Sequence, residues 1–171
     1  MMQDHAAHYM QLALLSGRRA LPACLPNPPV GCVLVRDSQV IASGFTQSPG
    51  RHHAEAMALE QVTGDLSDVV AFVTLEPCSF HGRTPSCARA LVDRGIKHVF
   101  VATLDPDTRN SGAGIKILEE AGVNVHLGIL EQQALNDLGP YLAMIANNSR
   151  QKDAGASPAL NPGQWPGASA L

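Results

Sequence analysis

Apolar and polar positions along the chain follow first a helical period and then a strand period. Apolar residues at helical spacing predict a helix over 4–17. A short apolar run rich in β-branched residues predicts a strand over 30–35. A turn at 37–38 leads into a second strand over 39–44, so we expect these two strands to form a hairpin.

The remaining pattern alternates helices with strands. Helices are expected to begin near 53, 84, 111 and 131, the last one ending near 146, and strands to cover 69–75, 98–104 and 123–127. This order predicts an α/β fold, a three-layer α/β/α sandwich around a mixed sheet of about five strands. The ligand crevices of such folds form at strand ends and helix starts, so functional residues are expected there.

The end of the chain differs in composition from the rest. Pro, Gly, Ala and Ser dominate it, and Trp165 is its one aromatic residue. Such a segment buries too little apolar surface to offset the entropy lost on ordering. We therefore expect one domain over 1–147 and a flexible tail over 148–171, with docking of Trp165 on a partner as the alternative.

Length and charge narrow the class of protein. The 171 residues suit one domain at ~150 residues per domain. The net charge of −3 argues against nucleic-acid binding and against a basic membrane-binding face. No apolar run reaches the ~18–20 residues that a membrane span needs, and the N-terminus lacks the basic start of a signal peptide. A cytoplasmic protein is expected, in which cysteines serve as metal ligands or buried thiols.

Four residues at predicted element ends carry candidate chemistry. His53 and Glu55 begin a helix, Cys78 follows the buried strand, and Cys87 lies in the first turn of the next helix. One His and two Cys are a three-ligand set that is typical of catalytic zinc, whose fourth position holds water. Zinc lowers the pKa of that water, and Glu55 would then carry protons to a leaving nitrogen. We predict one zinc ion per chain, bound by His53, Cys78 and Cys87, with Glu55 as the catalytic residue.

The helix geometry sets a condition on this prediction. On an ideal helix, side chains two positions apart, such as those of His53 and Glu55, point ~200° away from each other. They converge only if His53 lies at the irregular first position, where the helix begins.

The same residues carry a resemblance to a known family. His-x-Glu followed by Pro-Cys and a further Cys is the signature of zinc deaminases. The segment 74–87 (TLEPCSFHGRTPSC) closely resembles the motif of the riboflavin-biosynthesis pyrimidine deaminases. The segment 26–32 (PNPPVGC) resembles the first motif of that family, and Asp105-Pro106 resembles its later acidic turn. The resemblance covers roughly residues 4–145.

The resemblance implies a fold, a reaction and partners. It implies a cytidine-deaminase-like fold and the hydrolytic removal of an amino group, as ammonia, from a diamino-ribosylamino-pyrimidinone 5′-phosphate. The residues that it assigns to substrate binding are Asn27, Thr46, Phe80, Arg83 and Asp105. Members are often fused to an NADPH-dependent reductase, so a separate reductase acting on the product is an expected partner. A homodimer is expected as well.

Some of these residues could instead have purely structural roles, and other functions are also compatible with the sequence. Asn27 could stabilise a Pro-flanked turn, and Arg83 could be a solvated loop cation. Thr46 and Phe80 stand where the family usually has His, which motivates deamination of a different aminopyrimidine or nucleoside as the alternative function. A catalytically silent zinc module is a third hypothesis, against which the intact Glu55 argues. A tRNA-adenosine deaminase is disfavoured by the net acidity and by the long spacing of the two cysteines.

Overall fold

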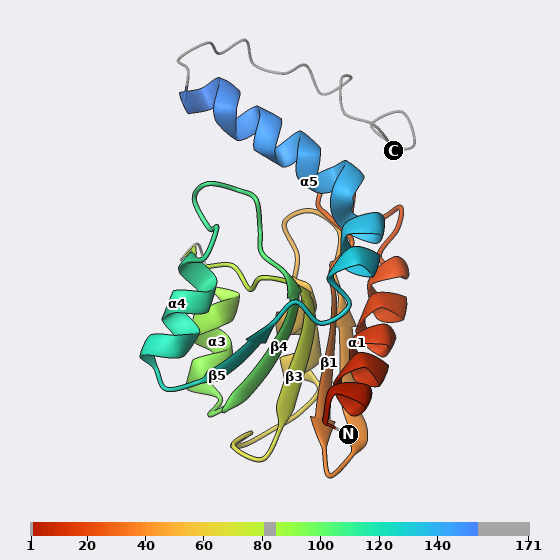
Figure 1. Ribbon diagram of the computed structural model, residues 1–171, viewed down its shortest axis with the longest axis vertical. Coiled ribbons are helices and arrows are strands. Elements are labelled where there is room, and N and C mark those ends of the chain that lie inside the picture. Colours follow the sequence, from red (N-terminus) through yellow and green to blue (C-terminus); the bar gives the residue numbers. More distant parts are fainter. Residues whose placement is uncertain (1, 81–84, 154–171) are drawn as a thin grey trace.

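The computed structural model describes residues 2–80 and 85–153 and contains a five-stranded mixed sheet in the order β2-β1-β3-β4-β5 (Figure 1). The strands are β1 (Gly31–Arg36), β2 (Gln39–Phe45), β3 (Val70–Leu75), β4 (His98–Thr103) and β5 (Asn124–Leu127). The helices are α1 (Met2–Arg18), α2 (Ala54–Glu60), α3 (Cys87–Asp93), α4 (Ala113–Glu120) and α5 (Glu131–Asp153). Strand β1 pairs antiparallel with β2 and β3, whereas β3, β4 and β5 run parallel.

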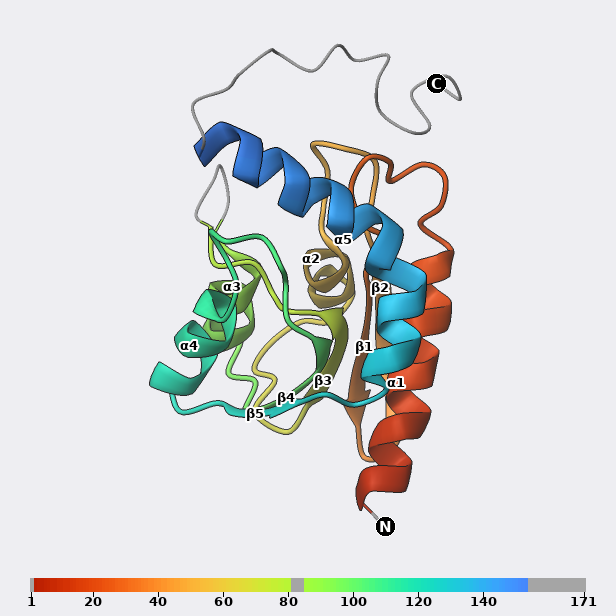
Figure 2. The same ribbon diagram turned by 45° about the horizontal axis from the view of Figure 1, so that its top comes forward.

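The helices form two layers around the sheet. Helices α1 and α5 cover one face, and α2, α3 and α4 cover the other (Figures 1 and 2). The central strands are buried on both faces, as the continuous apolar run over 69–75 predicts. The expected three-layer α/β/α fold is therefore confirmed. Among the described residues, no helix is both long and apolar enough to cross a membrane.

A row of aromatic rings crosses the face of the sheet that α1 covers. Phe72 of β3, Phe100 of β4 and His126 of β5 are neighbours in register, and their ring centroids lie 4.8 Å and 4.3 Å apart. Tyr9 of α1 continues the row at 5.3 Å from Phe72. Apolar contact through these rings joins α1 to three strands.

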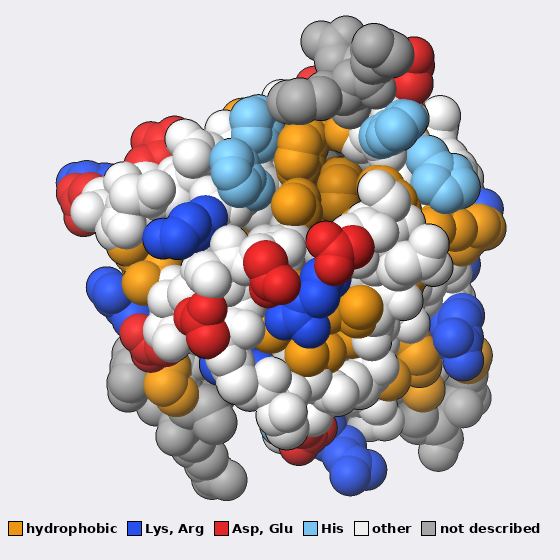
Figure 3. Space-filling view, turned by 90° about the horizontal axis from the view of Figure 1, so that it is seen from below, with side chains coloured by type: hydrophobic (Ala, Val, Ile, Leu, Met, Phe, Trp, Pro, Cys, Tyr) orange, Lys and Arg blue, Asp and Glu red, His pale blue; other side chains and the backbone are white. Residues whose placement is uncertain are grey.

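Figure 3 shows the molecule from below, with hydrophobic side chains gathered between two groups of histidines. Acidic and basic side chains are interspersed over the rest of this face.

The hairpin and its packing bring the start of α2 close to the sheet. Asp37 and Ser38 both have positive φ, at 50° and 61°, which is the type I′ geometry whose twist suits a two-residue hairpin turn. At Gly44 in β2, a Cβ atom would lie 2.1 Å from the carbonyl oxygen of Ala54. Only glycine allows this approach, and it places the first turn of α2 directly against β2.

Two element ends differ from the sequence prediction by three residues or more. Helix α3 begins at Cys87 rather than at Thr84-Pro85, because the Ser86 hydroxyl accepts a hydrogen bond from the Arg89 N–H at 3.1 Å and caps the helix. Helix α5 continues to Asp153, beyond the expected end near 146.

The extension of α5 beyond residue 146 is explained by the amino acids that follow. Asn147, Asn148 and Ser149 are weak helix formers, but no Gly or Pro follows 146 before Gly155, and Arg, Gln and Lys at positions 150–152 are good helix formers that continue the helix. Residues 148–153, expected in the tail, are therefore helical. Trp165 and the rest of 154–171 lie outside the described residues, and the tail stays a prediction.

Candidate active site

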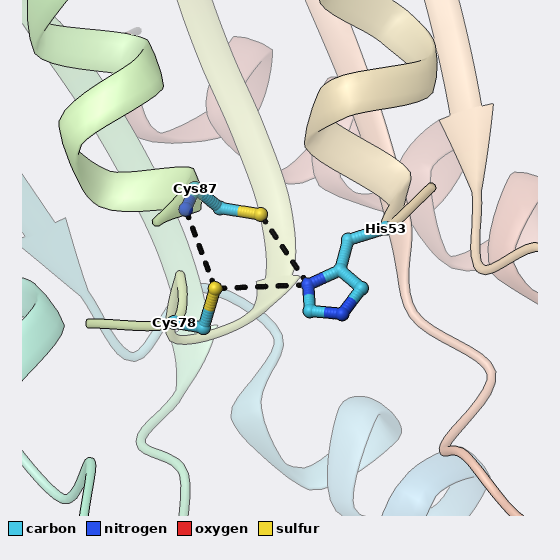
Figure 4. A group of neighbouring side chains, drawn as sticks. All are labelled: His53, Cys78 and Cys87. Atoms are coloured by element: carbon cyan, nitrogen blue, oxygen red, sulfur yellow. Dashed lines mark hydrogen bonds between the residues drawn. The ribbon is translucent and has the colours of Figure 1, made fainter. Parts of the chain in front are cut away.

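The ligand atoms of His53, Cys78 and Cys87 lie within 4.8 Å of one another (Figure 4). Nδ1 of His53 is 3.6 Å from Sγ of Cys78 and 3.4 Å from Sγ of Cys87. In a tetrahedral zinc site, bonds of about 2.3 Å to sulfur and about 2.0 Å to nitrogen separate these atoms by ~3.5 Å. The two observed distances lie on either side of that value. The three side chains are therefore positioned to bind a metal ion, and their spacing fits zinc.

The backbone at the start of α2 meets the condition set by the sequence. His53 is the N-cap residue, with φ −73° and ψ 168°, so its backbone is extended rather than helical. Glu55 lies in the first turn of α2. Because His53 stands outside the helix, the ideal angular separation does not apply, and both side chains reach the same pocket.

The start of α3 brings the two cysteines together across the intervening loop. The N–H of Cys87, the first residue of α3, donates to Sγ of Cys78 at 3.3 Å, and the N–H of Ala88 donates to the carbonyl oxygen of Cys78 at 3.2 Å. N–H groups at a helix start favour negative charge, so they stabilise the Cys78 thiolate that a metal ion requires.

The ionisation of the three groups is coupled through short contacts. The pKa of Cys78 is lowered to about 4, chiefly by the hydrogen bond from the Cys87 thiol. The pKa of His53 is raised to about 9, chiefly by its hydrogen bond to Cys78, and the pKa of Cys87 is raised by the same Cys78 contact and by burial. The charged groups are thus arranged around the Cys78 thiolate, and a metal ion bound by His53, Cys78 and Cys87 would take the place of the protons on His53 and Cys87.

Glu55 has the environment of a proton carrier. Its residue surface is only 4% exposed, and burial raises the pKa of its carboxyl group to about 6. The negative charge of Cys78 raises this pKa further, whereas the positive charge of His53 opposes the shift. A carboxyl group with a pKa near neutrality can both accept and donate a proton at physiological pH.

A pocket of about 170 Å³ connects these residues with most of the predicted substrate-binding ones. Its lining includes the predicted Asn27, Thr46, His53, Glu55, Cys78, Phe80 and Asp105. Cys87 is buried beside the other two ligand residues. Arg83 lies outside the described residues. The other lining residues were given no individual role from the sequence, although the first four lie in the quoted 26–32 and 74–87 segments: Pro28, Val30, Leu75, Glu76, Asp107 and Leu142.

Thr46 uses its hydroxyl group to hold the backbone of the 26–30 loop. The hydroxyl oxygen accepts from the Val30 N–H at 3.0 Å, and the hydroxyl donates to the Pro28 carbonyl oxygen at 2.9 Å. Thr46 is buried, with 6% of its surface exposed. The side chain therefore connects the end of β2 to the loop that carries Asn27.

Phe80 and Asp105 line the pocket in different ways. The Phe80 ring is 40% exposed, and the Arg109 guanidinium lies 4.9 Å from its centroid. Asp105 accepts a hydrogen bond from the Asp107 N–H at 2.9 Å, and burial raises the pKa of its carboxyl group. The pocket thus offers an aromatic ring and a carboxylate.

Glu76 joins the end of β3 to the following loop and helix, a role that was not predicted from the sequence. Its carboxylate is buried and accepts hydrogen bonds from the N–H groups of Asp105, Gly112, Gly114 and Ile115. The start of α4 and the β4–α4 loop are thereby attached to the end of β3. A charged residue immediately after a buried apolar strand is the sequence signal that could have revealed this role.

Comparison with known proteins agrees with this geometry. A model of the cytidine and deoxycytidylate deaminase zinc-binding region matches residues 3–103, a segment that contains His53, Glu55, Cys78 and Cys87. The riboflavin biosynthesis protein RibD of Aquifex aeolicus is 40% identical over 134 residues, which are 78% of this chain and 38% of that protein.

Two solved structures are similar as well. Acinetobacter baumannii RibD, at 40% identity, aligns with a TM-score of 0.81 over 85% of this chain and 41% of that chain. The diaminohydroxyphosphoribosylaminopyrimidine deaminase/5-amino-6-(5-phosphoribosylamino)uracil reductase of Thermotoga maritima, at 34% identity, aligns with a TM-score of 0.82 over 86% of this chain and 43% of that chain. This chain thus spans less than half the length of these relatives.

The family model covers more than half of the chain, and the zinc-binding residue types lie at ligand distances within the matched segment. The chain therefore belongs to the cytidine and deoxycytidylate deaminase family with its zinc-binding region.

Proposed function

We propose that this chain is a zinc-dependent hydrolytic deaminase of an aminopyrimidine, the diamino-ribosylamino-pyrimidinone 5′-phosphate of riboflavin biosynthesis. The supporting observation is that the buried Glu55 carboxylate lines the same pocket as the His53 and Cys78 side chains. The choice of substrate is supported by the 40% identity to the RibD proteins of Aquifex aeolicus and Escherichia coli and by the printed activity of the Thermotoga maritima relative.

His53, Cys78 and Cys87 would hold the zinc ion. When bound, zinc supplies an activated water nucleophile at neutral pH. Glu55 takes a proton as the water oxygen attacks the amino-bearing ring carbon. It then returns that proton to the amino nitrogen, the carbon–nitrogen bond breaks, and ammonia leaves. The ring carbon keeps the oxygen, so one water is consumed for each ammonia released.

The rest of the pocket would bind and orient the pyrimidine. Asn27 offers both a donor and an acceptor, and the Asp105 carboxylate accepts hydrogen bonds from amino or hydroxyl groups of the substrate. Phe80 presents a ring face on which a flat pyrimidine can stack. Thr46 contributes by holding the loop that carries Asn27. Arg83 is proposed for the phosphate, because the guanidinium fork matches phosphate oxygens.

A partner enzyme is suggested by the fate of the deaminated product. The Thermotoga maritima relative joins a deaminase and a reductase in one protein. We therefore propose that a reductase consumes the product of this chain, and that the chain acts as a homodimer in the cytoplasm.

An ammonia-release assay over a panel of phosphorylated and free aminopyrimidines tests the proposed function. The riboflavin intermediate is expected to give the highest kcat/KM, and Glu55→Gln is the matched inactive control. Preference for another pyrimidine or nucleoside would overturn the substrate assignment. Absence of ammonia release from every compound, with zinc bound, would indicate a silent zinc module.

A further inference from the structure

Asn110 contacts the backbone on both sides of Cys78. Its Oδ1 accepts a hydrogen bond from the Ser79 N–H at 3.0 Å, and its Nδ2 donates to the Pro77 carbonyl oxygen at 3.4 Å. Asn110 is 1% exposed, so these contacts are shielded from water. The residue before Cys78 and the residue after it are thus held by one side chain 32 positions further along the chain.

The same carboxamide also contacts the substrate pocket. Nδ2 of Asn110 donates to Oδ2 of Asp105 at 3.3 Å, and Asp105 lines the pocket together with Cys78. One side chain therefore joins the backbone around a metal-binding thiolate to a carboxylate that faces the substrate.

Asn110 is itself held in place by the β4–α4 loop. Its backbone N–H donates to the Asp107 carbonyl oxygen at 2.9 Å, and its carbonyl oxygen accepts from the Ala113 N–H. Gly114, at the start of α4, allows a very close approach, because a Cβ atom there would lie 1.9 Å from the Pro77 carbonyl oxygen. Together with the Glu76 contacts, this packing fixes the backbone of Asn110, so its side chain can hold the backbone of residues 77–79 in position.

The chemistry of the side chain suits this position. The Ser79 N–H requires an acceptor, and the Pro77 carbonyl and the Asp105 carboxylate require donors. A carboxamide supplies both kinds of group from one planar head. An aspartate would keep the acceptor, lose both donors, and place a second negative charge beside Asp105.

We propose that Asn110 is a positioning residue that fixes Cys78 for metal binding and couples it to Asp105. This inference rests on the proposed zinc site of His53, Cys78 and Cys87. Removal of the partners that orient a metal ligand typically lowers metal affinity or activity by ~10–100-fold. The effect on zinc affinity is therefore expected even when no substrate is present.

Zinc affinity of the purified protein, measured by competition with a chromophoric chelator, tests the proposal. The variants are Asn110→Asp, which keeps the size of the side chain, and Asn110→Ala, which removes the head group. Thr74→Val is the matched control, because Thr74 is also buried and also pairs with backbone, accepting from the Gly31 N–H at 3.1 Å, but away from the 77–79 segment. Melting temperature is measured for all of the proteins.

Both Asn110 variants are expected to bind zinc ~10–100-fold more weakly than the wild type, while Thr74→Val keeps wild-type zinc affinity at a lower melting temperature. A merely structural role would lower the melting temperature of Asn110→Asp and leave the zinc dissociation constant of the folded protein unchanged. That result would overturn the inference. A wild-type protein that binds no zinc would instead overturn the proposed function.

Discussion

Nδ1 of His53 and Sγ of Cys87 lie 3.4 Å apart, although the two residues are 34 positions apart in the sequence. His53 caps α2 and Cys87 begins α3, so the contact joins the starts of two helices on the same face of the sheet. At the start of α3 the N–H of Cys87 donates to Sγ of Cys78, which favours the negative charge of that thiolate.

Metal analysis of the purified protein is expected to give about one zinc per chain. Cys87→Ala leaves two of the three ligands, so we expect loss of the metal and a lower melting temperature, since metal binding contributes to folding stability. Cys24→Ala is the control, because Cys24 is a buried thiol outside the site. A metal-free protein with full activity would contradict the prediction.

Glu55→Gln is expected to keep zinc and the fold but to lose ~10²–10⁴-fold in kcat, because the amide cannot carry the proton. The substitution preserves the size of the side chain, so zinc content and melting temperature serve as internal controls. Steady-state ammonia release measures the loss. Activity close to that of the wild type would remove Glu55 from the mechanism.

Asp105→Asn is expected to affect stability in a pH-dependent way. Burial raises the pKa of Asp105 in the folded state, so ionisation of this group disfavours folding. This cost is absent below the unfolded pKa and develops as pH rises through the folded pKa. The variant should therefore become more stable relative to the wild type as pH rises: its free energy of unfolding, minus that of the wild type, should be larger at about pH 7 than at about pH 4.

Urea unfolding of the wild type and Asp105→Asn at both pH values measures this difference. The same variant should also lose activity, since the proposed acceptor for substrate is weakened. A stability difference that stays constant with pH, or that changes in the opposite direction, would show that burial of Asp105 does not control its ionisation.

Thr46→Val is expected to destabilise the protein by ~0.5–1.5 kcal/mol, because the Val30 N–H and the Pro28 carbonyl oxygen lose the shared hydroxyl but keep their hydrogen bond to each other at 2.9 Å. The KM for the pyrimidine should rise, since the same contacts hold the loop that carries Asn27. Thr63→Val is the control, because Thr63 is exposed. An unchanged KM in a folded Thr46→Val protein would show that the loop keeps its position without the hydroxyl.

Local sequence patterns determined the elements and most of the site residues. Continuous burial of β3 follows from an almost uninterrupted apolar run, and the hairpin follows from a polar pair between two apolar segments. The residue types His, Glu and two Cys at element ends indicated zinc chemistry, because few other functions need that combination. These signals are readable from a sequence because they depend on neighbours in the chain.

The tertiary structure decided what depends on distant contacts. The spacing of His53 and Glu55 allowed their side chains to point either apart or toward the same site. The extended backbone of His53 at the N-cap decided between these two arrangements. Asn110 belongs to no motif recognised in the sequence, and the 74–87 motif contains Glu76 without revealing which groups its carboxylate contacts. Their roles arise because the β4–α4 loop, about 30 residues after β3, folds back over the end of that strand. Hydrogen bonds between segments so far apart depend on how the chain packs, and no local period records them.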